Sequence, residues 1–201
     1  MMEQPRRTQQ QRREATIAKL MDATIDCLVE HGYRDTSIGR ICARAGVSHG
    51  GLFRHFRSRI ELLAAVTDEV AKRHIAQLQT LVAELPAEGD VVDSMVRFFR
   101  QSTREPVGSA WREVIVACRT DEALREAVSP AVQRFEDAIM TTSAALSGRP
   151  SADPHFGTLV MSLLHMFDSE ATTAKVFADD AVEAIRHEWA VNLLRQALKQ
   201  A

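Results

Sequence analysis

Apolar residues recur three and four positions apart over most of the chain, which is the spacing of an amphipathic helix. The first predicted helix covers about residues 13–31 and stops at Gly32. A second helix of little more than two turns, which Thr36 or Ser37 can cap, stops at Gly46. Because Ser48 can cap a third helix only two residues later, the second and third helices must meet at a steep angle, as in a helix-turn-helix.

The same spacing continues through the rest of the chain. It predicts further helices over about residues 58–85, 90–103, 106–120, 121–128, 129–146, 155–177 and 179–199, with a restart where Ser129 can cap and Pro130 suits a first helical position. No segment alternates apolar and polar residues in the manner of a strand. We therefore expect an all-α fold of about nine helices. Residues 1–57 are expected to form a small basic domain with a three-helix helix-turn-helix, of which 1–12 is a flexible arm, and residues 58–201 a larger acidic helical bundle.

The predicted third helix is weak by itself. Gly50 and Gly51 each cost on the order of 1 kcal/mol relative to alanine inside a helix. Packing through Val47, Leu52 and Phe56 must therefore hold this helix in place. Without Cβ atoms the backbone can approach another surface closely, and the major groove of DNA accepts a helix of this kind.

Charge is polarised along the chain. Residues 1–60 hold 11 Lys and Arg against 6 Asp and Glu, whereas the remaining residues hold 14 against 21. A basic N-terminal part is consistent with a polyanionic partner, although a solvated surface gives the same bias.

The candidates for DNA contact lie around the second and third helices. Ser48, His49 and the free amides of the third helix can bind phosphates or base edges. Arg54 and Arg59 can neutralise backbone charge, whereas Arg44 could equally be solvated and His55 could equally pack against the first helix. The full set is Thr36, Ser37, Arg44, Ser48, His49, Gly50, Gly51, Phe53, Arg54, His55 and Arg59.

These residues match a known family. The segments EHGY (30–33) and DTSIGRICARAGVSHGGLFRHFRSRIELL (35–63) resemble the N-terminal domain of TetR-type transcriptional regulators. The resemblance implies an all-α homodimer that binds a near-palindromic operator in double-stranded DNA, usually as a repressor, and releases it when a small molecule occupies the C-terminal bundle. The chain departs from the family at Phe53, where tyrosine is common, and at Gly51, where a small residue with a Cβ is usual. We expect fewer side-chain contacts to bases and more reliance on Ser48, His49 and DNA shape.

Candidates for an effector site are apolar and aromatic residues of the bundle, because a mostly apolar pocket with few polar groups is the usual ligand site. Each could also be plain core. His165, among apolar neighbours, needs a partner such as Asp168, Glu170 or a ligand. The candidates are Met95, Phe98, Phe99, Trp111, Cys118, Met161, His165 and Met166.

The last two predicted helices carry apolar stripes that could pack within one subunit. The family resemblance implies instead that this helix pair forms an intersubunit four-helix bundle. The interface candidates are Phe156, Leu159, Val160, Leu163, Phe167, Val182, Ile185, Trp189 and Leu193.

Other classes of function are disfavoured. Three sparse cysteines predict no disulfide, and Cys27 and Cys42 fall on apolar faces, so we expect no metal site and no cofactor. Neither a signal peptide nor a run of about 18 apolar residues is present, so no membrane contact and a cytoplasmic location are expected. An all-α di-iron enzyme would need Glu-x-x-His pairs that the sequence lacks. A helical protein-interaction module of the same fold, without DNA binding, stays open as the alternative, and salt-dependent binding to a duplex would separate the two.

Overall fold

The computed structural model describes residues 8–84, 90–147 and 154–199, and within these ranges the chain forms nine helices and no strand. The N-terminal unit consists of α1 (Gln9–Asp35), α2 (Ile38–Ala45) and α3 (His49–Phe53). The remainder consists of α4 (Arg59–Glu84), α5 (Val91–Arg104), α6 (Pro106–Ala117), α7 (Glu122–Ser147), α8 (Pro154–Thr173) and α9 (Asp180–Lys199). The predicted all-α fold with an N-terminal helix-turn-helix is confirmed.

Local signals account for the short helices. Ser37 caps α2, and its side chain accepts a hydrogen bond from the amide of Arg40. Gly46 ends α2 in the left-handed conformation, with φ at 63°. Ser48 then caps α3. Inside α1, Gly32 has φ at 72° and breaks the helical path, as predicted, although helical turns resume up to Asp35.

The start of α1 differs from the expected flexible arm. Thr8 and Gln11 form a capping box, in which the Thr8 side chain accepts from the Gln11 amide and the Gln11 side chain accepts from the Thr8 amide. Residues 9–12 are therefore the first turn of α1, while residues 1–7 of the predicted arm lie outside the described residues.

The predicted break before Pro130 is wrong, because α7 runs unbroken from Glu122 to Ser147. Pro130 gives up one helical hydrogen bond. Val128 and Ala131, on either side of it, are both buried in the core, so the two halves of α7 pack as one surface. The Ser129 hydroxyl donates to the Arg125 carbonyl instead of capping a new helix.

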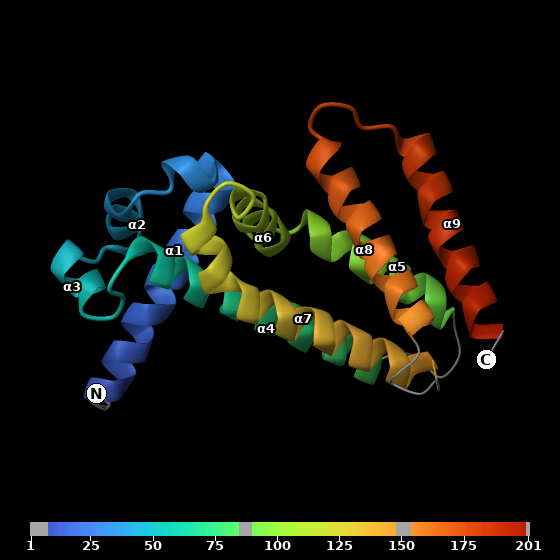
Figure 1. The fold of residues 1–201 in the computed structure, drawn as a ribbon, viewed down its shortest axis with the longest axis horizontal. Helices are drawn as coiled ribbons and strands as arrows, with labels where there is room; N and C mark the ends of the chain where they lie inside the picture. Colours follow the sequence, from blue (N-terminus) through green and yellow to red (C-terminus); the bar gives the residue numbers. More distant parts are fainter. Residues whose placement is uncertain (1–7, 85–89, 148–153, 200–201) are drawn as a thin grey trace, which may run out of the picture.

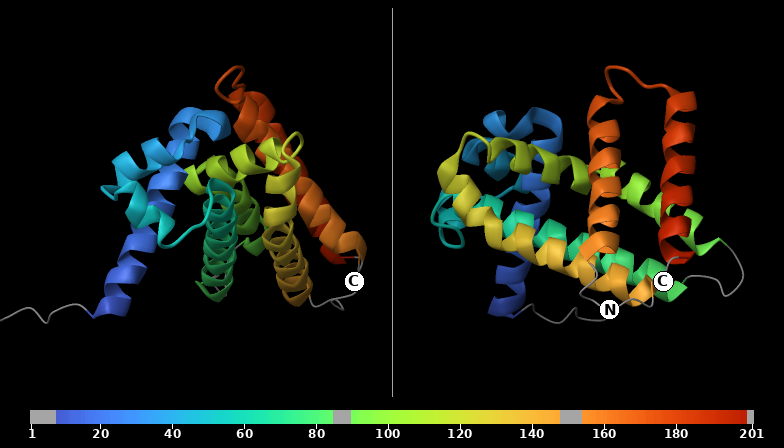
Figure 2. Two further views of the ribbon diagram at one scale, coloured as in Figure 1. Left: turned by 60° about the vertical axis from the view of Figure 1, so that its left-hand side comes forward. Right: turned by 45° about the vertical axis from the view of Figure 1, so that its right-hand side comes forward.

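The molecule is long, with the N-terminal unit at one end (Figure 1). Helices α4 and α7 run side by side through its centre, and α8 and α9 stand together at the other end with α5 beside them (Figures 1 and 2). Helix α6 lies between the two ends and packs against α1.

Two clusters of buried apolar side chains hold this arrangement together. The first joins Leu20 and Leu52 of the N-terminal unit to Leu63, Val114 and Leu124 of α4, α6 and the start of α7. It also contains the free cysteines Cys27 and Cys42, whose predicted burial is confirmed. The second cluster lies among α4, α5, α7, α8 and α9. Within the described ranges, no helix combines the length and apolar character needed to cross a membrane.

Candidate DNA-binding surface and ligand cavity

Helix α3 presents a polar and aromatic face to solvent because its apolar side is fully used by the core. Leu52 is completely buried, and Phe56, just after the helix, is 6% exposed. On the other side Ser48, His49 and Gly50 are exposed, together with Arg54 and with Phe53, which is 51% exposed. A phenylalanine ring that is this exposed to solvent is available to contact a partner.

The two glycines of α3 have different surroundings. A Cβ atom at Gly50 would meet nothing within 4 Å, so this face is open. A Cβ atom at Gly51 would come within 2.9 Å of Val47 Cγ1, so a side chain here would force Val47 to shift. Only Gly50 fits the predicted role of giving another surface close access to the backbone.

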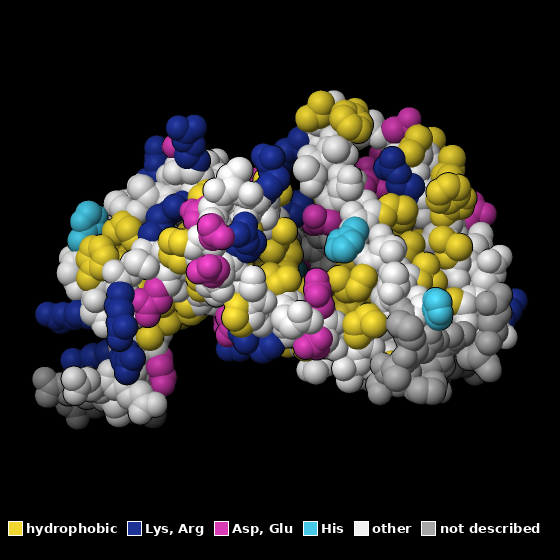
Figure 3. All heavy atoms as spheres, viewed as in Figure 1, with side chains coloured by type: hydrophobic (Ala, Val, Ile, Leu, Met, Phe, Trp, Pro, Cys, Tyr) yellow, Lys and Arg dark blue, Asp and Glu magenta, His cyan; other side chains and the backbone are white. Residues whose placement is uncertain are grey.

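Helix α2 adds to the same face. A Cβ atom at Gly39 would lie 3.9 Å from His49 Nε2, so the first turn of α2 lies beside the start of α3. Arg40 on α2 is exposed, as are Arg54 and Arg57, and no ion pair of these three occurs in the described part of the chain. Sequence reasoning missed Arg40 and Arg57. Lys and Arg side chains gather over this end of the molecule (Figure 3).

Two residues of the predicted DNA-contact set use their side-chain hydrogen bonds within the protein. Thr36 is fully buried, and its hydroxyl donates to the Gly32 carbonyl at 2.7 Å. The Arg59 guanidinium donates from Nε to the Thr36 carbonyl at 2.7 Å, also bonds the Tyr33 carbonyl, and lies 4.2 Å from the Tyr33 ring centroid. Both residues therefore close the end of α1, and we remove them from the DNA surface.

Arg44 forms ion pairs within the domain, and His55 is half-buried. Arg44 pairs with Asp26 at 3.2 Å and with Glu30, and its guanidinium holds the pKa of the Glu30 carboxyl below the usual range. The His55 Nδ1 atom is buried, and the described residues provide no hydrogen-bond partner for it. The residues that remain exposed on this surface are Ser37, Ser48, His49, Gly50, Phe53 and Arg54 from the predicted set, with Arg40 and Arg57 in addition.

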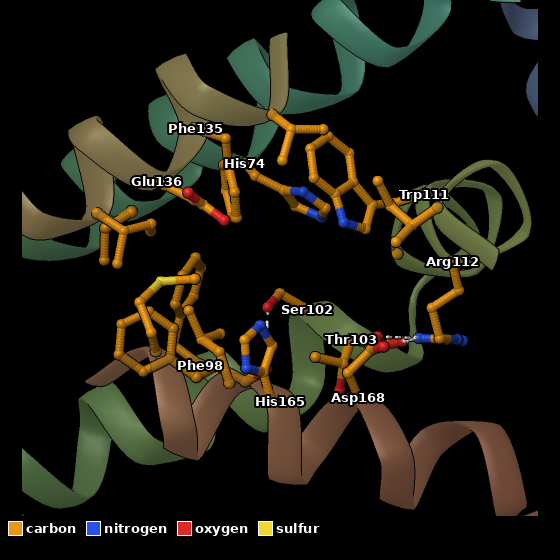
Figure 4. Close-up of a pocket in the computed structure, with 18 of the residues that line it drawn as sticks. His74, Phe98, Ser102, Thr103, Trp111, Arg112, Phe135, Glu136, His165 and Asp168 are labelled. Atoms are coloured by element: carbon orange, nitrogen blue, oxygen red, sulfur yellow. Dashed lines mark hydrogen bonds and ion pairs between the residues drawn. The ribbon is translucent and has the colours of Figure 1, made fainter. Parts of the chain in front are cut away.

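A cavity of about 200 Å³ lies between α4, α5, α6, α7 and α8 (Figure 4). Five of the predicted effector residues line it: Phe98, Phe99, Trp111, Met161 and His165. His165 is exposed overall, and its ring faces the cavity in Figure 4. The structure does not bring Met95, Cys118 and Met166 to the cavity. Met95 and Met166 pack in the second cluster, and Cys118 packs against the first.

Several cavity residues were missed by sequence reasoning. His74 of α4, Phe135 and Glu136 of α7, and the pair Arg112 and Asp168 all point into the same space (Figure 4). Arg112 Nη1 lies 2.9 Å from Asp168 Oδ1. Burial lowers the pKa of His74 to about 4, so its imidazole is neutral at physiological pH. In the part of the chain that is described, no group of acidic, His or Cys side chains is arranged to hold a metal ion.

Helix α6 connects the cavity with the end of the molecule that carries α1, α2 and α3. Trp111 and Arg112 form part of the cavity wall, while the next residue, Glu113, accepts the backbone amide of Tyr33 at 3.0 Å. The Tyr33 hydroxyl donates to Asp121 Oδ2 at 2.6 Å. Burial, together with this hydrogen bond, raises the pKa of Tyr33, and the same bond lowers the pKa of Asp121. The end of α1 is thus fixed to α6 and to the start of α7.

The predicted interface residues divide into two groups. Phe156, Val160, Leu163 and Phe167 of α8 are each at most 6% exposed and belong to the second cluster, and Leu159 packs against it. These side chains already pack against partners within the chain, so we do not keep them among the predicted interface residues. On α9 the stripe of Val182, Ile185, Trp189 and Leu193 is 37 to 64% exposed. Hydrophobic side chains also gather over this end of the surface in Figure 3.

Comparison with known proteins agrees with this geometry. Residues 20–66 match the family described as bacterial regulatory proteins, tetR family. The HTH-type transcriptional regulator Rv2912c of Mycobacterium tuberculosis is 35% identical over 193 residues, covering 96% of this chain and 99% of the relative. The HTH-type transcriptional regulator CymR of Pseudomonas putida is 29% identical over 188 residues, covering 94% of this chain and 87% of that protein.

Solved structures share the fold at low sequence identity. A transcriptional regulator from Rhodococcus sp. superposes with a TM-score of 0.66 at 22% identity, covering 92% of this chain and 96% of that one. A TetR transcription regulator from Haloarcula marismortui gives a TM-score of 0.64 at 19% identity, covering 93% and 98%. The helix-turn-helix, the helical bundle and the full-length similarity to curated regulators together place this chain in the TetR family of transcriptional regulators, which are not enzymes.

Proposed function

We propose that this regulator binds a near-palindromic operator as a homodimer, acts as a repressor, and leaves the DNA when a small ligand occupies the cavity between α4 and α8. The observation that carries the proposal is the position of α6, because adjacent residues of this helix line the cavity and hold the end of α1.

The surface of α2 and α3 supports the DNA-binding part. Ser37 and Ser48 lie at the two helix starts, where backbone amides and the positive end of the helix favour phosphate. His49 and Phe53 face outward from α3, where they can meet base edges and thymine methyl groups. Arg40, Arg54 and Arg57 supply cations for the phosphate backbone.

The exposed stripe of α9 supports the dimer. Four large apolar side chains at helical spacing form a continuous patch, and patches of this kind are typical of interfaces. A two-fold axis beside α9 would give a dimer that carries two copies of α3. Two such helices can read half-sites about one helical turn of DNA apart, so the operator would be near-palindromic.

The coupling follows from differential affinity, because a ligand can only shift an equilibrium between arrangements that it binds unequally. Helix α4 begins at the DNA-binding unit and contributes His74 to the cavity, while α6 connects the cavity to Tyr33. A ligand that moves α6 against α4 therefore acts directly on the end of α1.

The DNA-binding part is tested by fluorescence anisotropy with a duplex selected from a random pool. Because neutralised phosphates release counterions, the logarithm of affinity should fall linearly with the logarithm of salt concentration. Arg54→Ala removes one cation from each protomer and should reduce the slope by about 2. Lys175→Ala, which removes an exposed cation beyond the end of α8, is the control and should leave the slope unchanged. A slope that both variants reduce equally would contradict this surface.

A further inference from the structure

The polar groups of the cavity differ in whether their hydrogen bonds are already used. Arg112, which is the cation of the lining, bonds Asp168 from Nη1 at 2.9 Å and Ser109 Oγ from Nη2 at 2.9 Å, and also bonds the Thr103 carbonyl. Its charge is therefore balanced, and its bonding terminal nitrogens are committed within the protein.

The hydroxyl groups that line the cavity also donate hydrogen bonds within the protein. Ser102 Oγ donates to the Phe99 carbonyl and Thr103 Oγ1 donates to the Arg100 carbonyl, both at 2.9 Å. Each hydroxyl oxygen keeps lone pairs with which it can still accept a hydrogen bond. These two side chains therefore offer acceptors to a ligand.

Glu136 is the charged group of the cavity whose charge is not balanced. Its carboxylate projects from α7 into the space (Figure 4), and within the described residues it forms no ion pair or hydrogen bond. The imidazoles of His74 and His165 and the indole of Trp111 offer N–H donors to a ligand. His74 supplies no positive charge to balance the carboxylate, because burial keeps its imidazole neutral. An anionic ligand would thus meet a free carboxylate and no free guanidinium or ammonium group.

Aromatic rings form the walls near this carboxylate. The Trp111 and Phe135 ring centroids are 5.1 Å apart, those of His74 and Phe135 are 6.0 Å apart, and Phe98 lies on the opposite side. The faces of such rings attract cations. The volume of about 200 Å³ is somewhat larger than an apolar cavity of about 150 Å³ that accommodates benzene, so it suits one substituted ring.

We propose that the cavity binds a single-ring aromatic amine in its cationic form, with the ammonium group at Glu136 and the ring between Trp111, Phe135 and Phe98. This deepens the ligand part of the proposed function and rests on that function only for its effect on DNA.

The ligand class is tested with three probes of matched shape: 4-methylbenzylamine, 4-methylbenzyl alcohol and 4-methylbenzoate. Isothermal titration calorimetry on the full-length protein should give the tightest binding for the amine. Glu136→Gln should weaken amine binding about 10-fold or more, the effect of losing an ion pair in a partly desolvated site, and should change alcohol binding less than about 2-fold. Glu126→Gln, on the exposed face of the same helix, should leave all three affinities unchanged.

Three outcomes would overturn the assignment: tightest binding of the benzoate, equal amine affinity in wild type and Glu136→Gln, or binding of none of the probes. Thermal melting curves of each variant show whether the fold is retained. Anisotropy with the selected duplex separates the two proposals. If the amine binds as expected but the duplex stays bound, the ligand class stands and the effector role fails. If the benzoate binds tightest and also releases the duplex, the effector role stands and the amine assignment fails.

Discussion

At the scale of single residues, the adjacent glycines Gly50 and Gly51 have different surroundings. Sequence pattern alone made Gly50 and Gly51 equivalent, since both lower helix propensity and both lack a Cβ atom. The structure separates them, because the atom that constrains Gly51 is a methyl carbon of Val47, outside α3 and in the turn before it.

Alanine at these two positions should therefore have opposite effects on stability. Gly50→Ala should raise the free energy of unfolding by up to about 1 kcal/mol, because alanine is the better helix former and the site is open. It should also weaken DNA binding. Gly51→Ala should lower the free energy of unfolding by about 1 kcal/mol, since Val47 must shift. Urea unfolding and anisotropy measure the two effects, and equal behaviour of the variants would refute the distinction.

His74 makes stability depend on pH. In the unfolded chain this imidazole takes up a proton near pH 6.5, whereas in the folded protein it does so only at about pH 4. The unfolded state therefore binds more protons between these values, so the free energy of unfolding falls as the pH falls through this range. A full shift corresponds to about 3 kcal/mol.

His74→Phe should remove this contribution while keeping an aromatic ring beside Phe135. Urea unfolding at pH 6.5 and at pH 4.5 should show a smaller loss of stability in the variant than in the wild type, by roughly 1 to 3 kcal/mol. Glu136, Asp168 and Arg112 line the same cavity and are kept in both proteins, so the two proteins differ only at residue 74. Identical pH profiles would rule out a titrating His74.

At the scale of elements, helix positions were predictable and helix partners were not. Gly46 and Ser48 carry local backbone signals that fix where α2 ends and α3 begins. Pro130 carries an equally strong local signal, yet α7 continues through it because its buried flanks pack as one surface. The apolar stripes of α8 and α9 look alike in sequence, and only the tertiary arrangement shows that the first is core and the second is exposed.

The α9 stripe should determine whether the protein is a dimer. Trp189→Glu with Leu193→Glu places charges on an apolar face, where an interface would leave them unpaired and desolvated. We expect monomers in sedimentation experiments and loss of specific DNA binding, with unchanged helical content by circular dichroism. Gln133→Glu, which adds one charge to an exposed position of α7, is the control. A dimer that survives the double substitution would place the interface elsewhere.

At the scale of the whole molecule, the candidate site was only partly visible in the sequence. Five of its aromatic, sulfur and imidazole residues were predicted from α5, α6 and α8. His74 and Glu136 were not, because each is a single polar residue on a long helix whose pattern predicts packing. Arg59 differs in the opposite direction, because this basic residue near the helix-turn-helix is half-buried and its guanidinium bonds the end of α1. Such choices depend on neighbours far away in the chain.

Coupling across the molecule should depend on Glu113. Glu113→Ala leaves the Tyr33 amide without its acceptor, which should lower stability by about 1 kcal/mol. The change in DNA affinity on adding 4-methylbenzylamine should shrink several-fold, because α6 no longer holds Tyr33, whereas amine affinity should stay close to wild type. Glu122→Ala, an exposed residue at the start of α7, serves as the comparison. Undiminished coupling in Glu113→Ala would mean that α4 alone carries the signal.

The first core cluster crosses the domain boundary that the sequence predicts after residue 57. Leu20 and Leu52 pack in the same cluster as Leu63, Val114 and Leu124. Replacing residues 1–57 with the corresponding segment of another regulator would therefore leave mismatched side chains on both sides of the junction. We expect hybrid regulators to fold when α1, α2 and α3 come from the same parent protein as α6 and the first turns of α4 and α7. Natural recombination within the family should face the same constraint.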